Sequence, residues 1–400
     1  MLRAAHFGSK LGFNLLKNAV GFDATSPMDI LQQLGGTYSK LAQLTCLDQP
    51  ERSVFDDCVP VNKDRLDAIF LEYCLRHGIN HDTAVFAASG SIGGVYKAQD
   101  PTTGEILAIK IRYPGIEDMI QKDLQAILTM TKLSDSLGGT NASPSAIQMA
   151  TSLETELDYE LERRTTERIG QLMATHNETY TSHDTVRVPR VHTHLCEENV
   201  LVTEYISDTT SFSKYIQKCS KPEQIRLCKA LFRFVFTCGC EGLIIGDPHW
   251  GNFMVDGEGQ VYAVDFGNVS TVNSNLVAEI LRLVRLSREG TFQEWEHRLI
   301  EAKPILIGDD KIVLNAQDCA NMYTLHCSMY DFLLEPSQVE HKTENIEAFN
   351  RQVQLGNTIK GGLSCFKSMF ILLNIACYCN ITCSFRGTVE GVLSEYGHRL

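Results

Sequence analysis

Two short polar stretches with a strand-like run between them constrain this chain more than any other feature. Asp247 is followed five residues later by Asn252 and eighteen residues later by Asp265, which opens the sequence Asp-Phe-Gly. The apolar run Gln260–Val264 leads directly into the second aspartate and is typical of a β-strand. A solvated surface loop would explain either stretch alone. Together, with a strand between them, they indicate one polar site.

This spacing resembles that of kinase-type phosphotransferases around Mg-ATP. In that chemistry the first aspartate, here Asp247, accepts or orients a proton. The asparagine and the aspartate of Asp-Phe-Gly, here Asn252 and Asp265, hold Mg²⁺ against the phosphates. We therefore predict that Asp247 and Asn252 are catalytic and that Asn252 and Asp265 bind the metal.

A glycine-rich segment upstream has the pattern of a phosphate loop. Residues Ala88–Val95 follow Gly-x-Gly-x-x-Gly-x-Val, except that Ala88 replaces the first glycine. Glycine lets the backbone close on phosphate oxygens without a Cβ in the way. Taken alone, the segment could equally be a hairpin turn. The positions predicted to contact nucleotide are Ala88, Gly90, Ser91, Gly93 and Val95.

A lysine follows this segment at a suitable distance. Lys110 ends the β-type run Ile106–Lys110, fifteen residues after Val95. That is about the separation of phosphate loop and nucleotide lysine in the small lobe of a kinase. A lysine at a strand end is by itself usually a solvated charge. In this combination we predict that Lys110 is catalytic and contacts the α- and β-phosphates.

An acidic helix should supply a carboxylate partner for that lysine. A helix is predicted over 143–161, with Ser143 as N-cap and proline at its first position. Its acidic residues include Glu156, Asp158 and Glu162. At about 100° per residue, Asp158 and Glu162 share a face, whereas Glu156 lies nearly opposite Asp158. A straight helix therefore cannot present all three carboxylates to one site.

Taken in order, these motifs resemble the UbiB family of atypical kinases, protein-kinase-like ATPases associated with coenzyme Q and isoprenoid-lipid metabolism. The resemblance covers most of the chain. Residues Leu34–Gln43 look like the family's Lys-x-Gly-Gln element. The segments Lys110–Ile116 and Glu156–Tyr159, together with Glu162, also match the family pattern.

The resemblance implies an α+β, protein-kinase-like, two-lobed fold. We predict an N-terminal helical extension over residues 1–82, a kinase-like N-lobe over 83–206 and a largely helical C-lobe over 207–400. In the family, the extension lies across the place where a peptide substrate would bind. The strand-like run Val200–Thr203 would lead into a hinge whose backbone, at Glu204 and Ile206, bonds adenine.

The resemblance also assigns roles around the extension. Lys40 and Gln43 would reach from the extension toward the active site as regulatory residues. Glu156 and Asp158 would interact with the extension, whereas Glu162 would pair with the nucleotide lysine. The two glutamates would then face different neighbours.

The chain departs from the family pattern at three places. Ala42 replaces the glycine of Lys-x-Gly-Gln, and Ser89-Gly90 stands where two alanines are usual. Trp250 occupies a position where the family commonly has proline, and the usual histidine upstream of Asp247 is missing. Because the residues of the magnesium chemistry are retained, we predict a competent site.

Composition and charge limit the classes of molecule that the chain is expected to bind. With 400 residues, of which 44% are hydrophobic and 21% charged, the chain can bury the core of a two-lobed domain. A net charge of −13 argues against a nucleic-acid binder. The fourteen cysteines form no paired Cys-x-x-Cys frame. Those at Cys238 and Cys240, and the group Cys365–Cys383, are predicted to be buried thiols in a reducing compartment.

The N-terminus bears on localisation. The first 22 residues carry Arg3, Lys10 and Lys17 and no acidic residue before Asp23. This pattern fits a mitochondrial presequence and equally the first helix of a membrane-associating extension. We predict a mitochondrial protein, with a cytoplasmic one as the alternative. The longest apolar segment, Met369–Ile381, is shorter than the roughly 20 residues of a membrane span, so any membrane contact would be peripheral.

These features predict an enzyme with ATP and Mg²⁺ as cofactors that hydrolyses ATP or transfers its phosphoryl group. The segment after Asp-Phe-Gly, Asn268–Asn273, enters a helical pattern without an Ala-Pro-Glu motif, which argues against peptide docking. A lipid or small molecule is the expected partner, in coenzyme Q or isoprenoid-lipid metabolism. One alternative is a small-molecule kinase, which the absence of an element like Lys40–Gln43 would favour, although the chain contains that element. The other is a catalytically weak scaffold of a lipid-biosynthetic complex.

Overall fold

The computed structural model describes most of the predicted kinase-like part of the chain. The described residues are 63–122, 124–125, 154–177, 184–306, 314–333, and 368–396 apart from 370, 373–374, 377 and 382. The chain divides into two compact units, Met1–Thr129 and Met130–Leu400, and each is considered by itself below. The predicted boundaries at residues 82 and 206 stay predictions. Lys40 and Gln43 lie outside the described residues.

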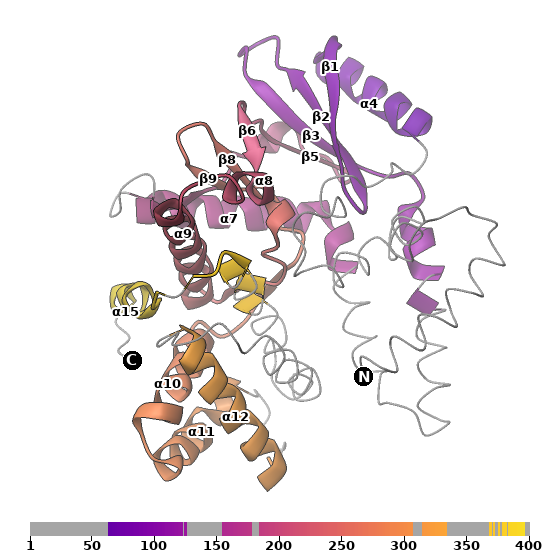
Figure 1. The fold of residues 1–400 in the computed structure, drawn as a ribbon. Coiled ribbons are helices and arrows are strands. Elements are labelled where there is room, and N and C mark those ends of the chain that lie inside the picture. Colours follow the sequence, from indigo (N-terminus) through magenta and orange to yellow (C-terminus); the bar gives the residue numbers. More distant parts are fainter. Residues whose placement is uncertain are drawn as a thin grey trace, which may run out of the picture. The chain divides into compact units, whose positions relative to one another are not determined.

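In the first unit, three strands form an antiparallel meander (Figure 1). They are β1 (Asn80–Ser89), β2 (Gly93–Gln99) and β3 (Ile106–Arg112). Burial alternates along β3, where Leu107, Ile109 and Ile111 are fully buried and Lys110 projects from the other face. The strand predicted from the run ending in Lys110 is thus confirmed.

One helix, α4 (Lys63–His77), packs on this meander. Its buried residues Leu66, Phe70 and Tyr73 recur at helical spacing. The ring of Phe70 stacks on Tyr96 of β2 with centroids 4.0 Å apart. Leu66 lies so close to Gly94 that a Cβ there would be 2.8 Å from its Cδ2. The helix therefore sits directly against the strand that follows the glycine-rich loop.

The second unit contains helices and short strands. Its main helices are α7 (Tyr159–Asn177), α8 (Phe212–Ile216), α9 (Lys221–Cys240), α10 (Leu276–Glu289), α11 (Phe292–Leu306), α12 (Ala316–Leu333) and α15 (Arg386–Glu395), with the 3₁₀ turns η3 (Thr193–Leu195) and η4 (Trp250–Asn252). Its strands are β4 (Val186–Arg187), β5 (Val200–Glu204), β6 (Thr209–Ser211), β7 (Leu243–Ile245), β8 (Phe253–Asp256), β9 (Val261–Ala263) and β10 (Val269–Thr271). The strand predicted at Val200–Thr203 is confirmed as β5.

Short strands interrupt the largely helical pattern of this unit. Strands β7 and β10 pair with each other. Strands β4, β9, β8 and β6 form a second small sheet in that order. The run Gln260–Val264 predicted β9, whereas the other strands of these two sheets are too short to leave a period-two pattern in the sequence.

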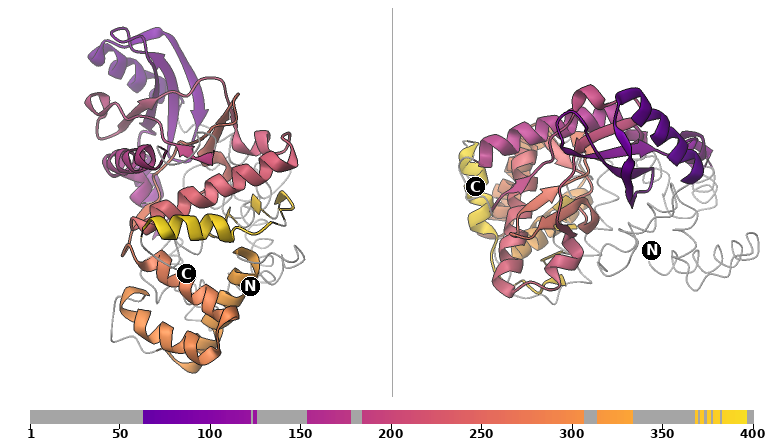
Figure 2. Two further views of the ribbon diagram at one scale, coloured as in Figure 1. Left: turned by 90° about the vertical axis from the view of Figure 1, so that its left-hand side faces the viewer. Right: turned by 90° about the horizontal axis from the view of Figure 1, so that it is seen from above.

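Helix α9 forms the centre of this unit's core. Its second half is buried on almost every side and packs against α10 and α15, and Figure 2 shows α15 running alongside α9. Burial raises the pKa of the Cys240 thiol to about 12. Because Cys238 and Cys240 are free and buried, the prediction of buried thiols is confirmed for these two.

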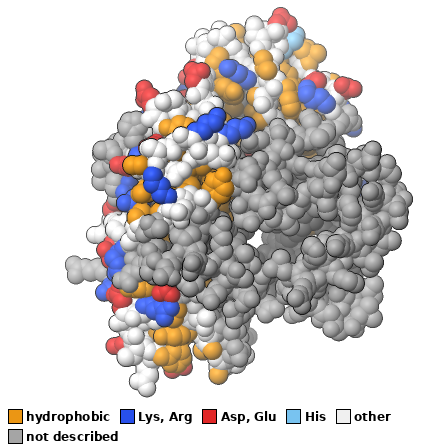
Figure 3. All heavy atoms as spheres, viewed as in Figure 1, with side chains coloured by type: hydrophobic (Ala, Val, Ile, Leu, Met, Phe, Trp, Pro, Cys, Tyr) orange, Lys and Arg blue, Asp and Glu red, His pale blue; other side chains and the backbone are white. Residues whose placement is uncertain are grey.

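The surface of the described residues is mixed in charge. On the face shown in Figure 3, acidic and basic side chains are interspersed with hydrophobic ones. Among the helices that the structure describes, none has the length and apolar character needed to cross a bilayer.

Candidate active site

Two strand pairs bring together the motifs that the sequence separates. In the β8–β9 hairpin, Phe253 pairs with Ala263, so Asn252 and Val264 lie side by side just beyond the paired ends. The Val264 amide donates to the Asn252 carbonyl over 3.0 Å. Asp265 is therefore held next to Asn252 by the backbone itself, as a shared magnesium site requires.

The second pair, β7 with β10, places Asp247 beside the same segment. Ile245 pairs with Val269, and the Gly246 amide donates to the Asn268 carbonyl over 2.8 Å. A Cβ on Gly246 would lie 2.6 Å from Asn268 Oδ1, so this approach needs a glycine. Asp247 directly follows that contact.

Hydrogen bonds fix the loop that carries Asp247. The Asp247 carbonyl accepts from the His249 amide over 2.9 Å and from Asn252 Nδ2 over 2.8 Å. Because the Asn252 amide nitrogen is directed at this carbonyl, Oδ1 is the atom that this side chain can offer to a metal.

His249 lies against the carboxylate of Asp247. Both side chains are buried, and His249 Nε2 is 3.8 Å from Asp247 Oδ2. His249 Nδ1 accepts from the Gly251 amide over 3.0 Å. A neutral imidazole that accepts at Nδ1 carries its proton on Nε2, which directs that proton toward Asp247. The sequence prediction did not single out His249, although it lies two residues from the aspartate.

The aspartate of Asp-Phe-Gly is held in a local turn. Asp265 Oδ1 accepts from the Gly267 amide over 2.9 Å, the Asx-turn geometry that aspartate favours. Phe266 is 3% exposed and packs near Phe234 of α9, with ring centroids 6.4 Å apart. The carboxylate is thus oriented by its own backbone and anchored by the next side chain.

Trp250 explains one departure from the family pattern. Its ring is fully buried and lies 6.1 Å from Phe212 and 5.4 Å from Tyr378, measured between centroids. Phe253, the residue that directly follows the 3₁₀ turn, also packs on Phe212. The large side chain therefore anchors the loop in the core and takes no place among the polar site groups.

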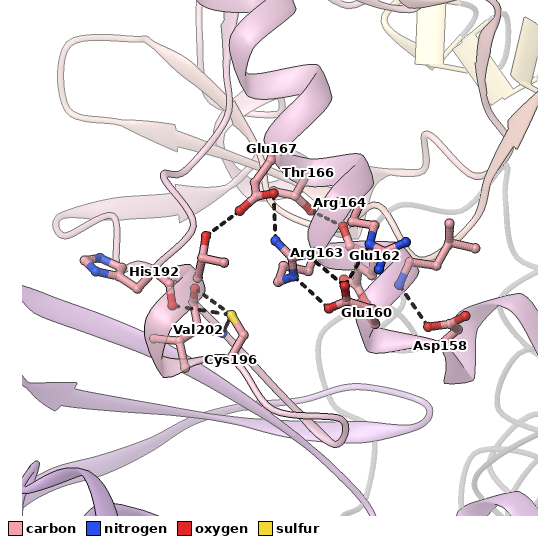
Figure 4. Close-up of polar contacts among 12 residues, drawn as sticks. Asp158, Glu160, Glu162, Arg163, Arg164, Thr166, Glu167, His192, Cys196 and Val202 are labelled. Carbon is pink, nitrogen blue, oxygen red and sulfur yellow. Dashed lines mark hydrogen bonds and ion pairs between the residues drawn. The ribbon is translucent and has the colours of Figure 1, made fainter.

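The acidic helix is interrupted, which corrects the prediction of one helix over 143–161. Of that span, residues 154–161 are described: 154–157 are helical, Asp158 is not, and α7 begins at Tyr159. Asp158 Oδ1 accepts from the Leu161 amide over 2.9 Å (Figure 4). This is the N-cap bond that aspartate commonly makes at the start of a helix.

The interruption brings two buried glutamates to one glycine. A Cβ on Gly267 would lie 3.4 Å from Asp265 Oδ1, 3.5 Å from Glu162 Oε2 and 3.6 Å from Glu156 Cγ. Glu156 is 6% exposed and Glu162 2%. Both side chains therefore pass close to Gly267, Glu162 with a carboxylate oxygen and Glu156 with its Cγ, and the different partners predicted for their carboxylates stay a prediction.

Three acidic side chains surround the Asp-Phe-Gly turn. Asp265, Glu156 and Glu162 all approach Gly267, and buried carboxylates require cations or hydrogen-bond donors nearby. Within the described ranges, no group of three or more His, Cys, Asp or Glu side chains has the geometry of a metal site. The kinase arrangement needs no such group, because one asparagine, one aspartate and phosphate oxygens complete the magnesium coordination.

Other acidic residues at the start of α7 serve the helix. Arg163 bridges Glu160 and Glu167, with distances of 2.7 and 2.8 Å (Figure 4). Arg164 also contacts Glu160 over 2.7 Å. The hydrogen bond from Arg163 lowers the pKa of Glu160 to about 2. These contacts lie on the outer face of the helix and tie it to Thr193 through Glu167.

The remaining predicted positions lie in two other places. In the first unit, Lys110 on β3 pairs with Val95 on β2, which follows the glycine-rich loop. In the second unit, Glu204 ends β5 and its amide donates to the Arg190 carbonyl over 2.8 Å. Any adenine contact from Glu204 would therefore use its carbonyl. The Ile206 carbonyl accepts from Thr209 Oγ1 over 3.3 Å.

Taken together, a meander with a glycine-rich loop and a strand lysine, and a second unit with Asp247, Asn252 and Asp-Phe-Gly, define a protein of the protein-kinase-like class. The family model of the ABC1 atypical kinase-like domain matches residues 81–290. Because this is more than half of the chain, the protein belongs to that family of atypical kinases, and the resemblance to the UbiB family is confirmed.

Individual relatives agree with this assignment. The chain is 32% identical over 199 residues to the protein ACTIVITY OF BC1 COMPLEX KINASE 1, chloroplastic, of Arabidopsis thaliana, covering 46% of this chain and 27% of that protein. It is 28% identical over 211 residues to the atypical kinase COQ8B, mitochondrial, of Rattus norvegicus, covering 51% and 37%. The matched part thus spans only about a third of the length of these relatives.

A solved structure supports the fold. The complex of Rv3197 with erythromycin from Mycobacterium tuberculosis matches with a TM-score of 0.50 and 18% identity, over 97% of this chain and 98% of that one. This likeness, together with the family match, confirms the predicted protein-kinase-like fold.

Proposed function

We propose that this protein binds Mg-ATP and hydrolyses it or transfers its phosphoryl group to a small molecule or lipid. The observation that carries the proposal is the convergence of Asn252 and Asp265 at the end of one hairpin, with Asp247 on the adjoining strand pair. Family membership supports it further.

The residues of the hairpin fit Mg²⁺. Asn252 Oδ1 and the Asp265 carboxylate are oxygen ligands, which this hard cation prefers. Asn252 Nδ2 and the Gly267 amide hold the two side chains in place. When bound, Mg²⁺ would neutralise the negative charge of the phosphates.

The other residues have roles that follow from their chemistry. Asp247 would take the proton of the attacking hydroxyl or water, and His249 would orient its carboxylate through Nε2. Gly90 and Gly93 would cover the phosphates, and Lys110 would contact the α- and β-phosphates. Glu162 would pair with Lys110, as the resemblance to the family implies.

The biological setting is part of the proposal. Coenzyme Q or another isoprenoid lipid is the pathway that the family suggests, with peripheral membrane contact and a lipid-biosynthetic complex as partners. Mitochondrial localisation is supported by the basic N-terminal 22 residues and by relatives whose names are mitochondrial or chloroplastic.

The decisive experiment measures Mg-ATP binding and turnover by purified protein, with and without anionic liposomes or a phenolic quinone-precursor mimic. The test variant is Asp265→Asn. The matched control is Glu160→Gln, the same change of acid to amide at an exposed ion pair of α7. We expect turnover that rises with lipid, vanishes in Asp265→Asn and persists in Glu160→Gln.

Other outcomes separate the alternatives. Tight nucleotide binding without turnover in every condition would replace the enzyme with a scaffold. Turnover that needs a soluble small molecule and ignores lipid would favour a small-molecule kinase. Absence of nucleotide binding to the wild-type protein would reject the proposal.

A further inference from the structure

The glycine-rich loop is closed by a hydrogen bond between its own two ends. Strand pairing continues to Ser89 and Gly94, and the Gly90 amide then donates to the Gly93 carbonyl over 2.8 Å. This bond closes a two-residue hairpin loop whose tip is Ser91 and Ile92. The backbone of the loop is thus held by its own hydrogen bond.

A buried tyrosine from outside the loop holds this hairpin. Tyr113, one residue beyond β3, is 2% exposed, and its amide donates to the Ile92 carbonyl over 2.9 Å. Its hydroxyl lies 2.6 Å from Ser89 Oγ and 3.3 Å from the Gly90 carbonyl. Tyr113 is therefore hydrogen-bonded to three residues of this segment: its hydroxyl contacts Ser89 and Gly90, and its backbone amide contacts Ile92.

One arrangement of hydrogens allows both contacts of Tyr113 Oη to be hydrogen bonds at once. A phenol has one hydrogen, and the Gly90 carbonyl can only accept. The two bonds together therefore require that Tyr113 Oη donates to the Gly90 carbonyl and accepts from Ser89 Oγ. The three groups form a relay in which the serine bond depends on the tyrosine hydroxyl, whereas the tyrosine can bond Gly90 without the serine.

We propose that Tyr113 is the positioning residue of the phosphate loop, and that Ser89 supports it, so that the loop is preorganised for the phosphates of a nucleotide. The proposal rests on the nucleotide binding proposed above. A loop that is already ordered loses less conformational entropy when its ligand binds, which strengthens affinity.

The chain's own departure from the family explains why such support is useful. Gly90 gives the loop more backbone freedom than alanine would. Ser89, the adjoining departure, supplies a hydroxyl that alanine lacks. The serine therefore offsets part of the freedom that the glycine introduces.

The first measurement is hydrogen exchange of the Gly90 amide in the nucleotide-free protein. A neutral buried hydrogen bond changes an equilibrium constant by about fivefold, so Tyr113→Phe should speed exchange about fivefold. Ser89→Ala should speed it about twofold. The double variant should match Tyr113→Phe, because the relay is already lost with the tyrosine hydroxyl.

A tyrosine on the same meander provides the control. Tyr96 is buried, and its hydroxyl donates to Asp67 of α4. Tyr96→Phe removes an equally buried hydroxyl without touching the loop, so it should leave Gly90 exchange unchanged. Faster exchange in Tyr96→Phe, or unchanged exchange in Tyr113→Phe, would overturn the proposal.

Nucleotide affinity tests the consequence. Preorganisation predicts that Tyr113→Phe weakens the equilibrium binding of Mg-ATP about fivefold, and that Tyr96→Phe does not. Tighter binding in Tyr113→Phe would show that the closed loop opposes the nucleotide and would reject preorganisation. Wild-type protein that binds no nucleotide would refute the proposed function and this consequence, whereas amide exchange would still decide whether Tyr113 holds the loop.

Discussion

The two parts of the candidate site are stabilised by different forces. In the second unit, strand pairing sets the positions of Asn252 and Asp265, and a fully buried Trp250 anchors the loop between them and Asp247. In the first unit, the glycine-rich loop is held by a turn bond and the hydroxyl of Tyr113. Large apolar burial costs several kcal/mol to disrupt, whereas one hydrogen bond is worth about 1 kcal/mol. The loop that carries Asn252 is thus held mainly by apolar burial, and the glycine-rich loop is held mainly by hydrogen bonds.

The largest expected effect comes from the removal of Trp250, which anchors the loop between Asp247 and Asn252 in the core. Trp250→Ala should lower the free energy of unfolding by about 3–5 kcal/mol, because it would leave a cavity between Phe212 and Tyr378. Urea unfolding measures the loss, and Trp250→Phe, which keeps an aromatic ring, is the control. An alanine variant as stable as the phenylalanine variant would contradict the role of the ring as an anchor.

The next effect compares two glycines at the two ends of the phosphate loop. At Gly94 a Cβ would lie 2.7 Å from Phe86 Cε2 and 2.8 Å from Leu66 Cδ2, so Gly94→Ala should cost about 1–3 kcal/mol of stability by overpacking. At Gly90 the atom nearest to an added Cβ would be the Gly93 carbonyl oxygen, 3.3 Å away. Gly90→Ala should therefore change stability much less. Equal losses in thermal unfolding would mean that α4 is free to move away from β2.

A third prediction separates the two glutamates at Gly267. Glu162 presents Oε2 and Glu156 presents the aliphatic Cγ to Gly267, and Glu162 is the residue that we propose as the partner of Lys110. We expect Glu162→Gln to weaken Mg-ATP binding about tenfold, equivalent to about 1.4 kcal/mol, and Glu156→Gln to have a smaller effect. Isothermal titration of both variants checks this. A larger loss in Glu156→Gln would reverse the assignment.

How far the sequence predicted this structure depends on the length of each signal. The strands at Ile106–Lys110, Val200–Thr203 and Gln260–Val264 carry runs of β-type residues, and all three are present. The spacing of the aspartates correctly predicted that distant loops belong together. The site roles themselves stay predictions until nucleotide binding is measured.

Features defined by a single residue or a tertiary contact were missed. The break at Asp158 contains no glycine or proline and lies within a continuous helical pattern of apolar residues. The only local signal is an aspartate three residues before Leu161, whose amide it caps. The anchoring by Trp250 depends on Phe212 and Tyr378, which are distant in sequence, and no local pattern indicates such a contact.

The smallest expected effect tests whether Asp158 acts through its shape or its charge. Asp158→Ala removes the N-cap of α7 and should cost about 1 kcal/mol in urea unfolding, whereas Asp158→Asn keeps a capping oxygen and should retain most of that stability. Because α7 also carries Glu162, Asp158→Ala should weaken nucleotide binding slightly as the first turn frays. Asp158 is exposed, so its charge is also available to the N-terminal extension. Asp158→Asn that is stable yet alters turnover would therefore support the predicted regulatory contact, and Asp158→Asn with normal turnover would leave the cap as the residue's whole role.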